Sequence, residues 1–426
     1  MEDHFKSLNL NNKETLFLTE QQFLQHFDKP LKITKEDLPN ILKITYSPEV
    51  TLKEAFLLEH PNKRKPIIKS PQDYRYVNKE KIIDYFYNVL VLQRDKYLKD
   101  IYKAYLQYEH PENLNWEKEI KINDDAISTQ KNDKSKTLIR NIFYLNLLHT
   151  TTLTNSAKPK VSFWQSLLNL FNHYKLEDRF FAPSCVQQYT NDKKSIPPYE
   201  VNFKTLFYLF QQYQPKASIL NPYTIHYILT QELKLQENFN FFTPVLSWCS
   251  YLVAFMETNG ANYVGVDVMP SVCSKAQMLS NWYSRKNTEI ILSPSEKLLQ
   301  DKEFLKKYTD FFHVVMVCPP YWKMEEYHEG EQSTDTYKTY EEWLTMYWEN
   351  TVKLCKIVLK KSGYFCYIAN DYSDLKKTEY CLTRDFQTIT TKYFSLHKEY
   401  KLVNRVSPER INKKDRTEKL FIMKQN

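Results

Sequence analysis

The stretch FFHVVMVCPPYW, residues 311–322, is the most informative about the fold of this chain. Its apolar, β-branched residues predict a buried strand, and the two prolines prevent that strand from continuing. The chain therefore leaves the strand along a fixed, extended path that holds a backbone carbonyl and an aromatic ring at the carboxyl edge of a sheet. Open α/β sheets bind ligands at that edge. A second Pro-Pro-Tyr, at residues 197–199, follows a polar run and is interpreted as a loop.

Further strands and helices are predicted upstream of this stretch. Residues 262–268 and 288–292 are short apolar runs typical of buried strands. Helices are predicted between them and beside them, at residues 251–258, 271–284 and 295–307. This alternation predicts a mostly parallel sheet with helices on both faces. Asp267 ends the first of these strands, where nucleotide-type folds place an acid that accepts hydrogen bonds from the ribose hydroxyls.

Residues 318–321, Cys-Pro-Pro-Tyr, resemble a motif of DNA methyltransferases that modify exocyclic amino groups of adenine or cytosine. That motif reads (Asp/Asn/Ser)-Pro-Pro-(Tyr/Phe/Trp). The blocks at residues 325–327, 331–333 and 339–344 are similar to members from phages and large DNA viruses, in which a loop leads into a long helix, here residues 340–360.

The resemblance continues to the end of the chain and covers residues 202–424. Residues 360–368 resemble the turn and fifth strand of the class I methyltransferase fold, and residues 400–403 and 420–424 its closing antiparallel pair. The resemblance therefore implies a Rossmann-like domain, residues 200–426, with a mostly parallel seven-stranded sheet covered by helices on both faces.

The same resemblance implies the residues of an S-adenosylmethionine site. The methionine portion would lie on the loop after the first strand, Asp267 would hold the ribose, and Ser293 and Glu296 would flank the adenine. The loop residues assigned to the cofactor are Thr243, Pro244, Ser247, Trp248 and Cys249. No metal is needed, and no Cys/His cluster with ligand spacing occurs in the sequence.

The resemblance also implies a catalytic site formed by residues 318–321. Cys318 stands where the family places a side-chain acceptor for the target amino group, and the Pro319 carbonyl supplies the second acceptor. Pro320 completes the Pro-Pro turn, and Tyr321 would stack on a base flipped out of the duplex. The alternative for Tyr321 is a core aromatic, since the chain holds 32 tyrosines.

The cofactor loop departs from the family. The viral type has Asp-Pro, a Gly-Trp-Gly turn and Arg-Leu, whereas Thr243, Ser247, Cys249 and Tyr251 replace the Asp, both Gly and the Arg. A left-handed backbone costs a residue with a side chain about 1 kcal/mol, and a lost charge-assisted bond costs about 1.5–3 kcal/mol. Sulfur at Cys318 is also a weaker acceptor than oxygen. A general loss of glycine, with 4 in 426 residues, accounts for Ser247 and Cys249 but leaves the other two replacements unexplained.

The N-terminal region, residues 1–195, carries no recognisable motif. It is predicted to be mostly α-helical, with helices at residues 78–108, 134–148 and 161–174, and to serve recognition or docking. The seven cysteines are scattered and are interpreted as reduced core thiols. No apolar run of membrane-spanning length or signal peptide is found, so the chain is expected to be intracellular, in the cytoplasm, the nucleus or a viral replication site.

Three functions remain open at this point. The favoured one is a methyltransferase-like protein with impaired or lost S-adenosylmethionine binding, acting as a nucleic-acid-binding or partner-docking scaffold. The alternative is an active enzyme that methylates adenine N6 or cytosine N4 in DNA, or in RNA. The third is a structural interaction protein that binds no nucleic acid. A net charge of +8 permits contact with DNA or RNA but does not require it.

Overall fold

A computed structural model describes most of the C-terminal half of the chain and parts of the rest. The described residues are 16–27, 34–37, 87, 99, 102–103, 105–106, 121–123, 126–128, 134–152, 217–283, 287–374, 377–403 and 418–425. Contacts divide the chain into two units. The first comprises Met1–Phe17, Tyr108–Thr154 and Lys216–Asn426, and the second Leu18–Gln107 and Asn155–Pro215. The first unit thus includes residues 108–154, which the sequence analysis placed in the N-terminal region.

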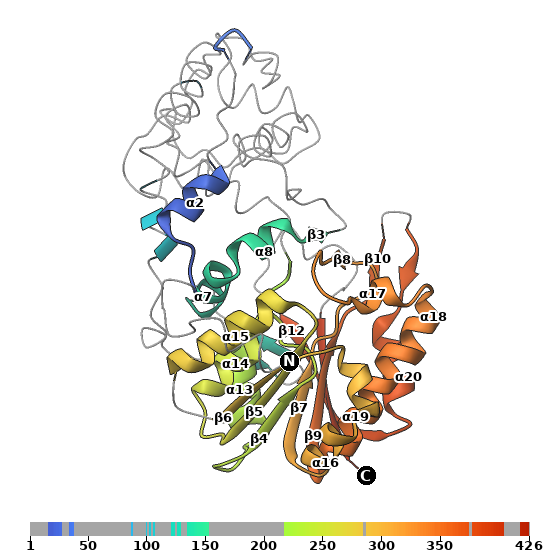
Figure 1. The fold of residues 1–426 in the computed structure, drawn as a ribbon. Coiled ribbons are helices and arrows are strands. Elements are labelled where there is room, and N and C mark those ends of the chain that lie inside the picture. The colour runs from blue at the N-terminus through green and yellow to red at the C-terminus, as the bar shows by residue number, and fades with distance from the viewer. Residues whose placement is uncertain are drawn as a thin grey trace, which may run out of the picture. The chain divides into compact units, whose positions relative to one another are not determined.

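The first unit is built on a mixed, mostly parallel sheet. Among the described residues, nine strands form it in the order β1-β2-β12-β13-β9-β7-β4-β5-β6 (Figure 1). The strands are β1 (Lys121–Asn123), β2 (Ala126–Ser128), β4 (Asn240–Thr243), β5 (Asn262–Asp267), β6 (Asn287–Leu292), β7 (Phe312–Val317), β9 (Leu359–Ala369), β12 (Phe394–Val403) and β13 (Glu418–Gln425).

Only the outer part of this sheet is antiparallel. Strand β13 runs antiparallel to both β9 and β12, whereas β6, β5, β4, β7 and β9 run parallel. This is a Rossmann-like, doubly wound arrangement, so the α/β prediction and the closing antiparallel pair are confirmed. The sheet is larger than the seven strands expected, because β2 adds to the edge of β12 and β1 pairs with β2.

Helices cover both faces of the sheet. One layer contains α13 (Pro222–Tyr227), α14 (Ser250–Met256) and α15 (Pro270–Tyr283), with α7 (Lys134–Ile142) packed against α13 and α14. The other contains η8 (Ser295–Gln300), α16 (Lys302–Tyr308), α18 (Tyr340–Trp343), η9 (Leu344–Trp348), α19 (Glu349–Val358) and α20 (Leu382–Thr390) (Figure 1). The second layer meets the sheet through aromatic packing: the ring of Tyr367 on β9 lies 5.5 Å from that of Trp348 and 6.3 Å from that of Phe386.

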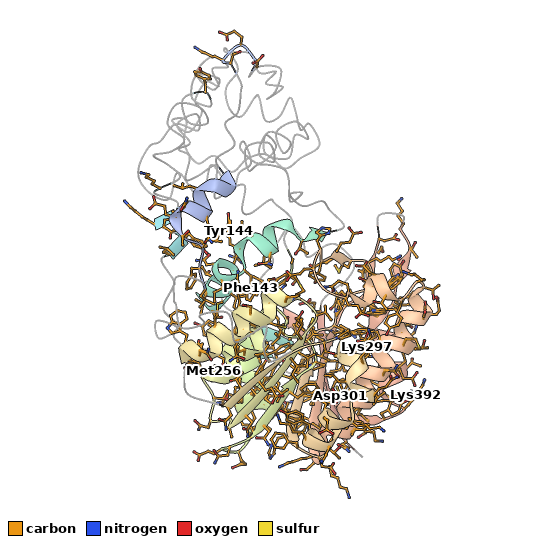
Figure 2. All side chains as sticks on the ribbon, viewed as in Figure 1. Phe143, Tyr144, Met256, Lys297, Asp301 and Lys392 are labelled. Carbon is orange, nitrogen blue, oxygen red and sulfur yellow. The ribbon has the colours of Figure 1, made fainter. Side chains whose placement is uncertain are left out.

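Two helix predictions need correction in their boundaries. The helix expected at residues 295–307 is broken at Asp301, whose carboxylate accepts the N–H groups of Glu303 and Phe304 and so begins α16 (Figure 2). The helix expected at 340–360 ends at Val358, and residues 360–363, expected as a turn, lie within β9. The reason is the register with β7: Phe312 pairs with Leu359 but Val314 with Tyr364, so the intervening residues bulge within the strand.

Residues 134–152 pack onto the first unit beside the sheet. The predicted helix 134–148 is confirmed, as α7 and α8 (Tyr144–His149), with a break at Phe143. Strand β3 (Thr151–Thr152) then pairs antiparallel with β8 (Glu325–Glu326). Predicted helix 161–174, most of 78–108 and the second Pro-Pro-Tyr lie outside the described residues.

In the second unit the structure describes helix α2 (Glu20–Phe27) and a few neighbouring residues. Its start is a capping box: Thr19 Oγ1 accepts the N–H of Gln22, and Gln22 Oε1 accepts the N–H of Thr19. Phe23 is buried against the rings of Tyr102 and Tyr105. No helix in the described ranges is long and apolar enough to cross a membrane.

Candidate active site

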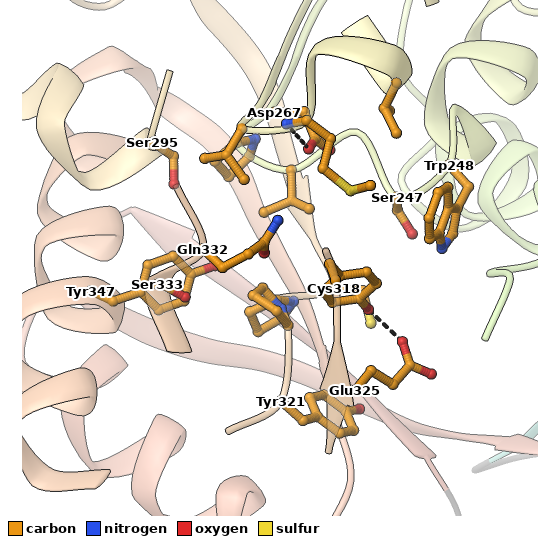
Figure 3. A pocket seen from close by; sticks show the side chains of 18 of the residues that line it. Ser247, Trp248, Asp267, Ser295, Cys318, Tyr321, Glu325, Gln332, Ser333 and Tyr347 are labelled. Atoms are coloured by element: carbon orange, nitrogen blue, oxygen red, sulfur yellow. Dashed lines mark hydrogen bonds between the residues drawn. The ribbon is translucent and has the colours of Figure 1, made fainter. Parts of the chain in front are cut away.

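A cavity of about 210 Å³ lies at the carboxyl ends of the central parallel strands (Figure 3). Its walls come from the segments that follow β4, β5, β6 and β7. The chain passes from β4 to β5 and β6 on one side and then returns to β7 on the other, so β4 marks the topological switch point of the sheet. Doubly wound sheets bind their ligands at this point.

The loop after β4 keeps a left-handed turn without any glycine. Ser247, Trp248 and Cys249 have φ angles of 49°, 55° and 63°, and the N–H of Ser250 donates to the Ser247 carbonyl at 3.1 Å. Each residue pays about 1 kcal/mol for this conformation. The backbone path that glycine would normally supply is therefore present here, at a cost in stability.

The predicted residues of this loop form two groups, of which one lines the cavity and the other is buried in the core. Pro244, Ser247 and Trp248 line the cavity. Thr243 and Cys249 are fully buried and are not part of the lining. The Thr243 hydroxyl lies 2.7 Å from the hydroxyl of Tyr263, so this side chain is satisfied within the core.

Tyr251, the residue in place of the family arginine, also belongs to the core. It is fully buried and packs edge-on against Phe241, with ring centroids 6.1 Å apart. Its hydroxyl has no hydrogen-bond partner among the described residues. An arginine at this position would be an unpaired buried charge, so the structure here is adapted to a neutral side chain.

Asp267 faces the cavity at the end of β5, as predicted. Its Oδ1 accepts the N–H of Met269 at 3.1 Å (Figure 3). Burial raises the pKa of this carboxyl to about 6, against the lowering effect of the backbone N–H groups of Met269, Val268 and Leu246. The group is therefore an ionised acceptor at neutral pH and is poised to lose its charge in mild acid.

The wall after β6 contains Ser293 and Glu296, both of which line the cavity. Glu296 accepts a hydrogen bond from the Tyr337 hydroxyl at 3.1 Å, and burial raises the pKa of its carboxyl. Tyr347, which the sequence analysis did not identify, closes the same side. It is 3% exposed and lines the cavity, and its hydroxyl has no partner in the described parts of the chain.

The residues of the Pro-Pro motif line the opposite end. Cys318, Pro319, Pro320 and Tyr321 all contribute to the cavity. Burial, together with the charges of Glu418 and Glu325, raises the pKa of the Cys318 thiol, so the thiol is neutral at pH 7. The Tyr321 ring is stacked on Tyr372, with centroids 6.0 Å apart and planes at 16°, and it also lines the cavity.

Two carboxylates at this end were not predicted. Glu325, on β8, accepts the Ser218 N–H at 3.0 Å and the Tyr327 hydroxyl, and Glu418 stands at the start of β13. The sequence analysis quoted Glu325 within a family-like block without giving it a role. Glu418 lies far along the chain and follows no motif, so only the pairing of β13 in the sheet reveals its position.

The described lining of the cavity is acidic, and one of its acids, the exposed Glu331, is paired with Lys297. The described lining holds five acids and no lysine, arginine or histidine; the acids are Asp267, Glu296, Glu325, Glu331 and Glu418. Such a site opposes phosphate groups and favours ligands that bring cationic groups and hydroxyl or amino donors. S-adenosylmethionine, with a sulfonium, an ammonium and a ribose diol, fits this donor requirement.

Neither metal binding nor disulfide chemistry is indicated by the described residues. They contain no group of three or more His, Cys, Asp or Glu side chains arranged to hold a metal ion. The six described cysteines are free, and four of them are buried. The remaining one, Cys185, lies outside the described residues.

The comparisons with known proteins give similar folds but no family. No protein-family profile and no curated protein matches the sequence. Similar solved structures include PH0226 of Pyrococcus horikoshii, at 13% identity and TM-score 0.32, covering 55% of this chain and 99% of that one. TrmN of Thermus thermophilus is 8% identical, with TM-score 0.33 and 49% of each chain covered.

A third similar structure is 1,6-didemethyltoxoflavin-N1-methyltransferase of Burkholderia thailandensis, which holds S-adenosylhomocysteine. It is 11% identical, with TM-score 0.30, and the match covers 48% of this chain and 77% of that one. Class I S-adenosylmethionine-dependent methyltransferases are thus among the similar structures. At these TM-scores they add no weight to the functional assignment, which rests on the strand order and the cavity.

Proposed function

We propose that this chain binds S-adenosylmethionine in the cavity and transfers its methyl group to an exocyclic amino nitrogen of a nucleic acid. The observation that carries the proposal is the position and charge of the cavity: it lies at the switch point of the sheet and its described lining is acidic without a cation. Pyrophosphate-bearing cofactors would meet repulsion in such a site. A cationic cofactor with a ribose diol would meet attraction.

Each wall of the cavity has a role in this proposal. Asp267 accepts hydrogen bonds from the ribose hydroxyls, and the turn at residues 247–249 carries the backbone past the methionine portion. Glu296 and Tyr347 supply an acceptor and a free hydroxyl on the side of the adenine. S-adenosylmethionine, when bound, supplies an electrophilic methyl group.

The reactive end orients the amino group that receives the methyl group. The backbone carbonyl of Pro319 is an acceptor that no side-chain replacement removes, and the Tyr321 ring, which lines the cavity, offers a stacking surface for a base. An amino N–H that donates to such acceptors pushes electron density onto nitrogen. Adenine and cytosine both carry such a group, and DNA and RNA both present it.

A direct test is a thermal-shift comparison on the purified, reduced protein. S-adenosylhomocysteine at 1 mM is expected to raise the Tm, whereas NAD and ATP at the same concentration leave it unchanged. Asp267→Asn is expected to remove the shift. A shift with ATP or NAD and none with S-adenosylhomocysteine would contradict the proposal.

A second candidate is a silent methyltransferase-like scaffold that docks nucleic acid or a protein partner. It is favoured by the neutral Cys318 thiol at the catalytic position and by Thr243, whose hydroxyl is committed to Tyr263 and is not part of the cavity lining. Binding of S-adenosylhomocysteine without transfer of a labelled methyl group to DNA or RNA oligonucleotides would support this candidate over the enzyme.

A further inference from the structure

Two carboxylates from distant parts of the chain meet at the reactive end of the cavity. Glu325 comes from β8, just after the Pro-Pro motif, and Glu418 from the first residue of β13. Both line the cavity together with Tyr321. Figure 3 shows Glu325 and Tyr321 at the end away from Asp267. Glu325 is therefore separated from the ribose side, and Glu418 lies close enough for its charge to raise the pKa of Glu325.

Glu325 is held in a fixed orientation but keeps free acceptor capacity. One of its oxygens accepts the Ser218 N–H at 3.0 Å and the other accepts the Tyr327 hydroxyl. Each carboxylate oxygen has two lone pairs, so one site on each oxygen remains for a ligand. The strand that carries Glu325 is itself held by β3, through the pairing of Thr152 with Glu325.

The charge of this pair is not balanced by a cation in the described lining. The positive charge of Lys136 on α7 lowers the pKa of Glu418, but Lys136 is not part of the lining. Burial and the neighbouring acid raise the pKa of Glu325, and burial raises that of Glu418. Two half-buried acids that line the same end of a cavity are costly unless a donor joins them.

An independent observation is that this cavity contains a buried hydroxyl group without a hydrogen-bond partner among the described residues. The hydroxyl of Tyr321, at the same end as Glu325 and Glu418, is buried and has no partner in the described chain. A buried hydroxyl without a partner destabilises the free protein, and a ligand that hydrogen-bonds to it removes that cost. The cavity thus offers both acceptors and a donor that the protein itself does not satisfy.

We propose that Glu325 and Glu418 form the acceptor site for the amino group that is methylated, in place of the side-chain acceptor that Cys318 does not supply. This inference rests on the proposed function. The target is a primary amino group on a nucleobase, since the aromatic ring of Tyr321 lines the same end of the cavity. The acceptor thus comes from positions 325 and 418 of the sequence and not from position 318, but it lies beside the same Pro-Pro turn.

The reaction balances with S-adenosylmethionine as the methyl donor. The lone pair of the amino nitrogen forms the new N–C bond as the C–S bond breaks, and that electron pair stays on sulfur as a thioether. The nitrogen then carries a surplus proton, which passes to the Glu325 or Glu418 carboxylate and from there to water. A carboxylate of raised pKa is a suitable acceptor for this proton.

The test uses sinefungin, an analogue that carries a primary amine where S-adenosylmethionine carries its sulfonium methyl. Full-length protein is titrated with sinefungin and with S-adenosylhomocysteine. The parent is expected to bind sinefungin at least about tenfold more tightly, because the amine faces the two carboxylates. Glu325→Gln and Glu418→Gln are expected to reduce this preference to about twofold or less, with the affinity for S-adenosylhomocysteine within about threefold of the parent.

The matched control is Glu326→Gln. Glu326 is the exposed neighbour on β8 and is not part of the cavity lining, so this variant is expected to keep the parent preference. An unchanged sinefungin preference in both Glu325→Gln and Glu418→Gln would overturn the inference and leave the proposed function standing. A parent that binds neither ligand would overturn both.

A transfer assay identifies the target class. Labelled S-adenosylmethionine is incubated with single-stranded DNA and RNA oligonucleotides and with a lysine-rich peptide. We expect methylation of an oligonucleotide by the parent. This activity is expected to fall at least about tenfold in Glu418→Gln and to recover when Cys318→Asp is added. Methylation of the peptide alone would overturn the assignment to a nucleobase, and no recovery would show that the carboxylates do not replace the residue-318 acceptor.

Discussion

Replacing Asp267 by asparagine is expected to stabilise the free protein at neutral pH and to abolish its cofactor binding. Asparagine has nearly the same shape and keeps an Oδ1 that can accept the Met269 N–H. It removes the carboxylate charge, which burial makes costly. One substitution therefore separates the cost of holding this acid in place from its benefit to ligand binding.

The size of the expected change in the free energy of unfolding follows from the pKa of Asp267. A rise from 3.8 to about 6 is about two units, which corresponds to an upper value of about 3 kcal/mol. The carboxylate faces a cavity that admits water, so about 1–2 kcal/mol is expected. The folded pKa is above the unfolded one, so the stability linked to protonation is present below pH 4 and is lost as the pH rises through 6.

The assay is urea unfolding of the parent and Asp267→Asn at pH 7.5 and at pH 4.0, with calorimetric titration of S-adenosylhomocysteine. The variant is expected to be more stable by about 1–2 kcal/mol at pH 7.5 and close to the parent at pH 4.0. Binding to the parent is expected to weaken as the pH falls below about 6, where Asp267 becomes protonated.

Asp335→Asn is the control, because Asp335 is exposed on α17 (Ser333–Thr336) and does not line the cavity. It is expected to change neither stability nor binding. Loss of stability in Asp267→Asn at pH 7.5, or an equal gain at both pH values, would refute the reasoning, because the charge of the buried carboxylate would then not be the cause.

Three further substitutions test other parts of the site. Ser247→Gly is expected to raise the free energy of unfolding by about 1 kcal/mol, since Ser247 has a positive φ and its side chain is only partly buried, and urea denaturation would check this; a fall would show that the side chain matters more than the backbone. Tyr347→Phe is expected to leave the free protein as stable or about 1 kcal/mol more stable, while weakening S-adenosylhomocysteine binding roughly fivefold by calorimetry; unchanged affinity would remove this hydroxyl from the cofactor site. Cys318→Ser is expected to leave cofactor affinity unchanged and to raise methyl transfer several-fold, because oxygen is the better acceptor; a lower rate would assign the thiol a role of its own.

The central strands were predictable because each is a continuous apolar run that ends at a recognisable residue. Strands β5, β6 and β7 lie where residues 262–268, 288–292 and 311–317 indicated, and Asp267 occupies the predicted strand end. In a parallel sheet covered on both faces, burial alone determines which residues are apolar. Each of these strands could therefore be predicted from its own residues.

The features that depend on pairing between distant segments of the chain were not predictable from the sequence. Strands β1 and β2 join the sheet through β12, more than 270 residues further along the chain, and no local pattern signals that pairing. The acids Glu325 and Glu418 meet in the cavity for the same reason. The early start of β9 depends on a bulge against β7, which is a property of the pair of strands.

The loop after β4 shows the limit of reading a motif by residue type. The missing glycines suggested a damaged site, yet residues 247–249 adopt the left-handed turn and two of them, Ser247 and Trp248, line the cavity. Conversely, Thr243 and Cys249, assigned to the cofactor by position, are buried outside the lining. Backbone conformation and burial, which single residues do not reveal, decide which positions face a ligand.

The most direct measurement is calorimetric titration of the purified, reduced full-length protein with S-adenosylmethionine and S-adenosylhomocysteine at pH 7.5. We predict binding of one molecule per chain with a Kd in the micromolar range, about −8 kcal/mol, and loss of that binding in Asp267→Asn. Absence of binding up to millimolar ligand would contradict the account, because the acidic cavity at the switch point would then have no cofactor to hold.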